Sequence, residues 1–229
     1  MARLSAAETA IYDRIRAAIA ARTLPPGMRL REVELCGIFG ASRGNVRKAL
    51  ARLAFDGLVN REPNRGATVA KPTPKQAEDL FAARKCIETT IARAAAQRLT
   101  KRDIVHLQSH IDKERRAADA GKQDRIVALS GEFHVLLAAI ADNSVLERYL
   151  VDLVARESLI IQLYERPGGA NCAHDEHSGI LEALISGEEA LIDARIAAHI
   201  ESIARGLDLQ ARPEAEPRLE DVLGPRVRA

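Results

Sequence analysis

The pattern of apolar residues predicts a helix from Ser5 to about Arg22. Its isoleucines recur every four residues, as on one face of a helix: Ile11, Ile15 and Ile19. At its start, Ser5 and Glu8 have the spacing of a capping box. The Leu24-Pro25-Pro26-Gly27 segment ends the helix, because proline cannot continue it and glycine permits a turn.

Two further helices are predicted next. The first runs from about Arg31 to Phe39 and ends at Gly40, and the second begins at Ser42, a residue favoured at the N-cap. The second helix carries apolar residues on one face: Val46, Ala49, Leu50 and Leu53. The Asp56-Gly57 pair ends it.

The period of the pattern then changes from helical to strand-like. Residues 58–61 and 67–70 form two short strand-like runs, and Pro-Asn-Arg-Gly at 63–66 has the composition of a turn. Three helices followed by a β-hairpin is the element order of a winged helix-turn-helix. We therefore expect this domain over residues 5–71.

The Lys71-Pro72-Thr73-Pro74 segment marks a domain boundary, because its two prolines stiffen the chain. Only helical patterns follow it: 74–98, 101–120, 123–141, 144–165, 171–186 and 188–210. We predict a mostly α protein in which an all-α antiparallel bundle of six to seven helices occupies residues 75–210. Residues 211–229 contain three prolines and few apolar side chains, and are expected to form a disordered tail.

Charge is distributed unevenly between the two predicted domains. The chain carries 34 basic and 32 acidic residues, but the part up to Lys75 has a net charge of +8 and the remainder −6. A basic domain attracts a polyanion such as DNA. The three cysteines form no CxxC pair, the N-terminus is charged, and no apolar run approaches the ~20 residues that span a bilayer. These features predict a cytoplasmic protein without a membrane partner.

Candidate DNA contacts lie at the start of the third helix and at the tip of the hairpin: Ser42, Arg43, Asn45, Arg47, Arg65 and Gly66. In a helix-turn-helix the second helix of the motif lies in the major groove. Arg43 and Arg47 are four residues apart, so they project from one face of it. Arginine suits bidentate contact with guanine, and a glycine at the hairpin tip allows close approach to the minor groove.

The segment from Ile11 to Thr73 resembles the winged helix of the GntR family. Two stretches match throughout, 24–32 (LPPGMRLRE) and 56–59 (DGLV). Single positions match between them and after them: Ser42, Arg43, Val46, Arg47, Ala49, Leu50, Leu53, Asn64, Arg65, Gly66 and Val69. The resemblance implies DNA contacts at Arg43, Arg47 and Gly66. The chain departs from the family at Gly44-Asn45, where Thr-Pro is usual, and at Lys48, where Glu is usual. Both departures fall on the surface that reads the operator.

Three of the six histidines, His134, His177 and His199, lie on separate predicted helices. Neutral imidazole binds Zn, Ni, Fe or Mn, and ligands on separate helices can converge inside a bundle. Scattered histidines are, however, more often surface or core residues than ligands. Spacing alone leaves both interpretations open.

Residues from Glu78 to about Leu207 resemble the FCD-type effector domain of FadR-subfamily regulators. Four stretches match: 132–134 (EFH), 141–143 (ADN), 176–177 (EH) and 180–184 (ILEAL). The other matching positions are Arg84, Glu88, Leu146, Ala194, Arg195, His199 and Ile200. The resemblance implies that His134, His177 and His199 bind a divalent metal such as Zn or Ni. It also implies effector contacts at Arg84 and Asn143. The alternative for Arg84 is an exposed pair with Glu88 on the same helix, and we favour the effector contact.

The fourth metal ligand of that family is an Asp one turn before the first histidine, and Ser130 occupies this position here. A hydroxyl leaves the site one negative charge short. Three alternatives follow: a three-histidine site completed by water or effector, recruitment of His174, or no metal.

Together these features predict a ligand-responsive transcription regulator, expected to be a repressor, that binds a palindromic operator as a homodimer. We expect a small organic acid as the effector and a divalent metal bound to the protein at the three histidines. One alternative is a regulator that responds to the metal itself. Another is a metal-dependent enzyme, but the spacing identifies no general base, so we expect no catalysis.

Overall fold

The computed structural model describes residues 4–62, 66–166 and 173–210, together with Leu223. Two compact units are distinguished, one containing the residues up to Pro72 and the other most of the chain from Thr73 onward. The tail expected at 211–229 lies outside the described residues, apart from Leu223.

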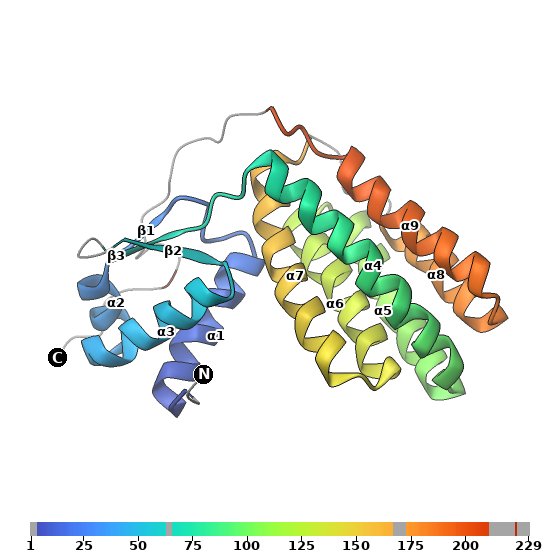
Figure 1. Ribbon diagram of the computed structural model, residues 1–229, viewed down its shortest axis with the longest axis horizontal. Helices are drawn as coiled ribbons and strands as arrows, with labels where there is room; N and C mark the ends of the chain where they lie inside the picture. The colour runs from blue at the N-terminus through green and yellow to red at the C-terminus, as the bar shows by residue number, and fades with distance from the viewer. Residues whose placement is uncertain (1–3, 63–65, 167–172, 211–222, 224–229) are drawn as a thin grey trace. The chain divides into compact units, whose positions relative to one another are not determined.

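Three helices and a three-stranded sheet form the described part of the first unit (Figure 1). Its elements are α1 (Ala6–Ala20), β1 (Arg29–Leu30), α2 (Glu32–Phe39), α3 (Arg43–Phe55), β2 (Val59–Glu62) and β3 (Gly66–Val69). The strands lie in the order β1-β3-β2, and both pairs are antiparallel. The predicted winged helix-turn-helix is therefore confirmed as the fold of this unit.

Local sequence signals explain where the helices of this unit begin and end. The Ser5 hydroxyl accepts a hydrogen bond from the Glu8 backbone N–H, and the Glu8 carboxylate accepts one from Ser5 N–H, so the capping box is present. The α2 helix ends at Gly40, which has a left-handed conformation with φ of +57°. The isoleucines of α1 and the apolar face of α3 are buried against each other.

The third strand, β1, was not predicted from the sequence. It contains only Arg29 and Leu30, which pair with Thr68 and Ala67 of β3. Two residues are too few to show the alternation by which strands are recognised. The strand exists because β3, about forty residues later, presents its free edge to this segment.

Six helices, apart from residues 158–163, form the described part of the second unit and lie side by side in Figure 1. They are α4 (Pro74–Arg98), α5 (Lys101–Asp119), α6 (Gln123–Ala141), α7 (Ser144–Tyr164), α8 (Ala173–Ser186) and α9 (Glu189–Arg205). The α4 helix packs on α6 and α9, α5 packs on α6 and α8, and α8 packs on α9. This number lies within the predicted six to seven helices.

The starts of α4 and α5 agree with the sequence pattern because capping residues define them. Thr73 and Thr100 cap α4 and α5, each through a complete capping box. The last helix is an exception, since it ends at Arg205 rather than at the predicted Gln210. Leu207 instead forms an isolated β-bridge with Glu165, a partner that local sequence does not reveal.

The interior of the bundle contains an unusual number of ionisable side chains. Buried among them are Arg84, Glu88, His110, Glu114, His134, Glu157, His177 and His199. Charged groups are seldom buried without partners, so this cluster indicates a site rather than ordinary core packing. Among the described residues, no helix combines the length and apolar character needed to cross a membrane.

Candidate metal centre and nucleic-acid interface

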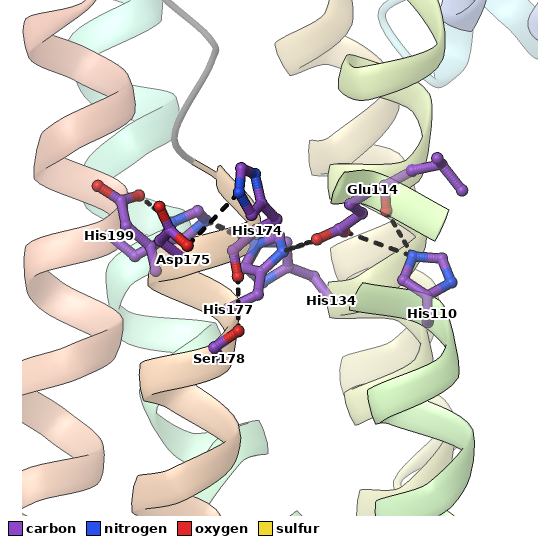
Figure 2. Close-up of polar contacts among 10 residues, drawn as sticks. His110, Glu114, His134, His174, Asp175, His177, Ser178 and His199 are labelled. Carbon is purple, nitrogen blue, oxygen red and sulfur yellow. Dashed lines mark hydrogen bonds and ion pairs between the residues drawn. The ribbon is translucent and has the colours of Figure 1, made fainter. Parts of the chain in front are cut away.

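Three histidines from three helices meet inside the bundle (Figure 2). His134 of α6, His177 of α8 and His199 of α9 are all buried. The Nε2 atom of His199 lies 3.0 Å from His134 Nε2 and 3.3 Å from His177 Nε2. Ligand atoms of the three rings all lie within 4.8 Å of one another. The tertiary structure therefore brings together the three histidines singled out in the sequence.

Each of these rings has a carboxylate beside its other nitrogen, Nδ1. The pairs are His134 with Glu88 at 2.5 Å, His177 with Glu114 at 2.8 Å, and His199 with Glu176 at 2.7 Å. The three glutamates come from α4, α5 and α8. A carboxylate behind each imidazole is the usual outer arrangement of a histidine metal site, because it fixes the tautomer and the ring orientation.

The proton count of the three rings favours a cation between them. A neutral imidazole carries one proton, and the hydrogen bonds of His177 Nδ1 with Glu114 and of His199 Nδ1 with Glu176 hold that proton on Nδ1. The Nε2 lone pairs of His177 and His199 then face each other at 3.3 Å, and His134 Nε2 lies 3.0 Å from His199 Nε2. A positive ion at this point would accept all three lone pairs at once.

The pKa values of the rings are consistent with neutral ligands. Burial lowers the pKa of His134 and of His199 to about 4, although Glu88 and Glu176 oppose it. Burial also lowers the pKa of His177, against the opposing hydrogen bond to Glu114. Near pH 7 the three imidazoles are therefore neutral, which is the form that binds metals.

These donors fit a divalent cation such as Zn or Ni, as the resemblance described above implied. Zinc lies about 2.0–2.1 Å from histidine nitrogen, which places tetrahedral ligand atoms about 3.3 Å apart. The observed Nε2 separations from His199 are close to this value. His174, the alternative ligand, is not part of the cluster, and its Nε2 instead lies 3.4 Å from the Asp175 carboxylate. Ser130 is half-buried on α6, one turn before His134.

Arg84 lies buried on α4 beside the histidine cluster. Its Nε donates to Glu88 Oε1 at 2.5 Å, and its Nη1 donates to Glu157 of α7. Its Nη2 is also buried and forms no hydrogen bond within the described parts of the chain. The pair with Glu88 considered from the sequence therefore exists, but it is buried rather than exposed.

Asn143, the other candidate effector contact, lies exposed before α7. Its side-chain oxygen accepts hydrogen bonds from the backbone N–H groups of Val145 and Leu146. This is the hydrogen bonding of a helix N-cap, and it supports the start of α7. The structure thus gives Asn143 a local structural role, independent of any effector.

The candidate DNA-reading residues lie at the start of α3. Arg43 and Arg47 are both exposed there. Ser42 caps the helix by accepting a hydrogen bond from the Asn45 backbone N–H at 3.2 Å. The Arg47 Nε donates to Glu32 of α2 at 2.8 Å, so this side chain is held across the turn between the two helices.

Gly66 begins β3 with a φ of +88°, a conformation that other residues adopt only with strain. A Cβ atom at this position would lie 3.2 Å from the Leu30 carbonyl oxygen. The fold itself therefore requires glycine at the end of the predicted wing. Arg65, the neighbouring candidate, lies outside the described residues.

Lys48, where the chain departs from the resemblance, has a partner within the domain. Its Nζ lies 2.9 Å from the Glu8 carboxylate of α1, which also completes the capping box of that helix. The positive charge at this position is therefore accommodated by a carboxylate on a neighbouring helix.

Glu114 is a site residue that the sequence interpretation missed. It lies on α5 with His110 one turn before it, on the buried face that also contains Leu107, Ile111 and Ala117. A histidine and a glutamate at helical spacing within an apolar stripe are unusual, and this was the available signal. Its partner could not be known, because His177 is 63 residues away.

Comparisons with known proteins identify relatives of both units. Residues 7–69 match the family described as bacterial regulatory proteins, gntR family, and residues 79–202 match the FCD domain. The HTH-type transcriptional repressor RspR of Escherichia coli is 27% identical over 198 residues, covering 86% of this chain and 87% of that protein.

Two solved structures share the fold. That of E. coli McbR/YncC has a TM-score of 0.79 at 19% identity and covers 88% of this chain and 97% of its own. A putative GntR transcriptional regulator from Rhodococcus sp. RHA1 has a TM-score of 0.74 at 21% identity, with the same coverage of both chains.

Proposed function

Because the chain belongs to the GntR family of bacterial regulatory proteins and carries an FCD domain, we propose that a small organic acid controls its binding to operator DNA through a metal-containing site. The protein is a DNA-binding transcription regulator. We assign DNA reading to residues 5–71 and sensing to residues 75–210. The relative RspR is named a repressor, which supports the same role for this chain.

The convergence of His134, His177 and His199 is the observation that carries the sensing part of the proposal. Three neutral nitrogen donors, each with a carboxylate beside its other ring nitrogen, provide a preformed binding site for Zn or Ni. Three protein ligands leave open positions on the ion, which the effector or water would occupy. Metal would act there as an anchor for an oxygen of the effector.

Arg84 supports an acidic effector. Its Nη2 is buried and has no hydrogen-bond partner among the described residues. Burial is the largest cause of the lowered pKa of His134 and of His199, and the positive charge of Arg84 lowers both pKa values further. Arg84 therefore lies close enough to act electrostatically on both rings. A carboxylate that bound the ion with one oxygen could offer the other to this N–H, a charge-assisted hydrogen bond. We propose binding without turnover, because the carboxylates behind the histidines are already engaged by the imidazoles.

For DNA reading we propose that two chains bind two inverted half-sites about one helical turn apart, with α3 of each in a major groove. Selection from a random double-stranded library tests this directly. We expect the enriched sequences to contain an inverted repeat. Enrichment of single, unrepeated sites would contradict the dimer proposal.

Replacing Arg47 by alanine should weaken binding to the selected operator by about 1–3 kcal/mol, because the variant loses base contacts in the major groove. Fluorescence anisotropy at fixed salt measures this change. Arg115→Ala is the matched control, since Arg115 is also an exposed arginine paired with a carboxylate, Asp112, but lies on α5 of the bundle. Equal affinities of Arg47→Ala and wild type would refute the assignment of α3 as the reading helix.

A thermal-shift screen against small organic acids, with and without Zn or Ni, tests the effector. A ligand that binds the folded chain raises its melting temperature. We expect acids that stabilise the protein only in the presence of metal, and we expect them to change operator affinity by a coupling of about 1–3 kcal/mol. If metal alone changes operator affinity and no acid has a further effect, the protein is a metal sensor and the acid proposal is wrong.

A further inference from the structure

The histidine cluster contains more negative charge than its ligands alone provide. Three neutral imidazoles bring no charge, and bringing a divalent ion into a protein interior is costly unless negative groups lie close by. Glu88, Glu114 and Glu176 each lie beside one ring. Arg84 pairs with Glu88 and offsets its charge, whereas Glu114 contacts His110 and His177, and Glu176 contacts His199 and Ser202.

We propose that Glu114 and Glu176 are positioning residues that set the affinity of the site for its metal. Each holds the proton of one histidine on Nδ1, so that Nε2 remains a free donor, and each places a negative charge behind the ring. This inference rests on the proposed metal site and adds the residues that control its strength.

The surroundings of His177 show how firmly Glu114 fixes its ring. Both carboxylate oxygens of Glu114 lie near His177 Nδ1, at 3.0 and 2.8 Å. The ring of Phe133 stacks on the imidazole, with centroids 4.0 Å apart and an angle of 12° between the planes. The edge and the face of the His177 ring are therefore both constrained, and Nε2 is directed toward His199.

A second histidine holds Glu114 itself in place. His110 Nε2 lies 3.5 Å from Glu114 Oε1 and 2.9 Å from the Leu129 carbonyl oxygen of α6. Figure 2 shows Glu114 between His110 and His177, with contacts to both. The carboxylate is thus oriented by α5 and α6, while the histidine that it holds belongs to α8.

Glu176 performs the same task for His199 from a more accessible position. Its Oε2 lies 2.7 Å from His199 Nδ1, and its side chain is 29% exposed. Replacement of this residue therefore disturbs packing less than replacement of the buried Glu114. Glu176→Gln removes the charge and keeps the side-chain shape, which makes it the first variant to test.

The experiment measures the affinity of the full chain for Zn by competition with a chromophoric chelator. We expect Glu176→Gln and Glu114→Gln each to weaken binding by about 10- to 100-fold. Glu201→Gln is the control, because Glu201 is an exposed glutamate on α9 that pairs with Lys85 rather than with a histidine. Its affinity should equal that of the wild type.

Nitrogen-15 NMR of the histidine rings measures which nitrogen carries the proton. A change in packing alone would not alter this tautomer. In the metal-free wild type, His177 and His199 should carry their proton on Nδ1. In each glutamine variant, the corresponding ring should show an increased population of the Nε2–H tautomer, while the other ring keeps its wild-type signal.

The outcomes separate this inference from the proposed metal site. If the wild type binds no Zn or Ni, the metal site itself is refuted, and the inference with it. If the wild type binds metal and Glu176→Gln binds it equally well with an unchanged His199 tautomer, only the inference is overturned. Should Glu114→Gln prove unstable, Glu176→Gln decides the result by itself.

Discussion

Replacing Arg84 by methionine is expected to lower the free energy of unfolding of the bundle by about 3–5 kcal/mol. Arg84 is completely buried and bonds Glu88 and Glu157, two buried carboxylates from different helices. Methionine fills a similar volume but offers no charge. Both carboxylates would then lie in the interior without their cation, which is among the most costly arrangements in a folded protein.

The two carboxylates depend on Arg84 in different ways. Burial acts to raise the pKa of Glu88, but the charge of Arg84, together with that of His134 once this ring is protonated below about pH 4, outweighs burial and holds the pKa of Glu88 at about 2. For Glu157, burial prevails over Arg84 and raises the pKa. We therefore expect Glu88 to remain ionised with Arg84 present, and removal of the arginine to affect Glu88 most.

Lys85→Met is the matched control for this prediction. Lys85 is the next residue on α4 and also pairs with a glutamate, Glu201, but both side chains are about half exposed. Exposed ion pairs contribute little to stability, so this variant should unfold almost as the wild type does. Chemical denaturation followed by circular dichroism measures both variants, and a change below 1 kcal/mol for Arg84→Met would show that the buried network does not stabilise the bundle.

Replacing His199 by alanine is expected to weaken Zn or Ni binding by more than about 100-fold, beyond the effect of an outer partner. The reason is geometric. The Nε2 atom of His199 lies next to the Nε2 atoms of both other histidines, so this ring joins the donor set. Without it, two nitrogens remain on α6 and α8, and two ligands hold a metal far more weakly than three.

Two measurements check this prediction. Equilibrium dialysis with elemental analysis should find up to one metal per wild-type chain and almost none for His199→Ala. Metal at about 100 times the wild-type dissociation constant should stabilise the wild type by about 2.7 kcal/mol and the variant by no more than about 0.4 kcal/mol. His106→Ala is the control, because His106 is an exposed histidine on α5. Equal metal content in all three proteins would refute the three-histidine site.

Much of the fold followed from local sequence patterns. The helices α4 and α6 begin and end at the predicted residues, because the residues that cap or interrupt a helix lie next to its ends in the sequence. The β1 strand and the end of α9 were not predicted correctly. Each depends on a distant partner, Ala67-Thr68 for β1 and Glu165 for Leu207, which follows the end of α9 by two residues.

The candidate site was only partly predictable. Sequence resemblance named the three histidines, and the helical pattern placed them on three different helices. Neither indicated which nitrogen of each ring would face the others. Glu114 was missed altogether, because a buried glutamate is recognised as a site residue only when its partner is known, and its partner lies on α8.

The sequence by itself determined which segments form helices and which arginines lie exposed on α3. These properties depend on residues a few positions apart, whose periodicity and capping chemistry are local. The tertiary structure decided how His134, His177 and His199 converge, which glutamate holds each ring, and that Arg84 joins Glu88 to Glu157. Those contacts join residues on separate helices, and the packing of the bundle brings them together.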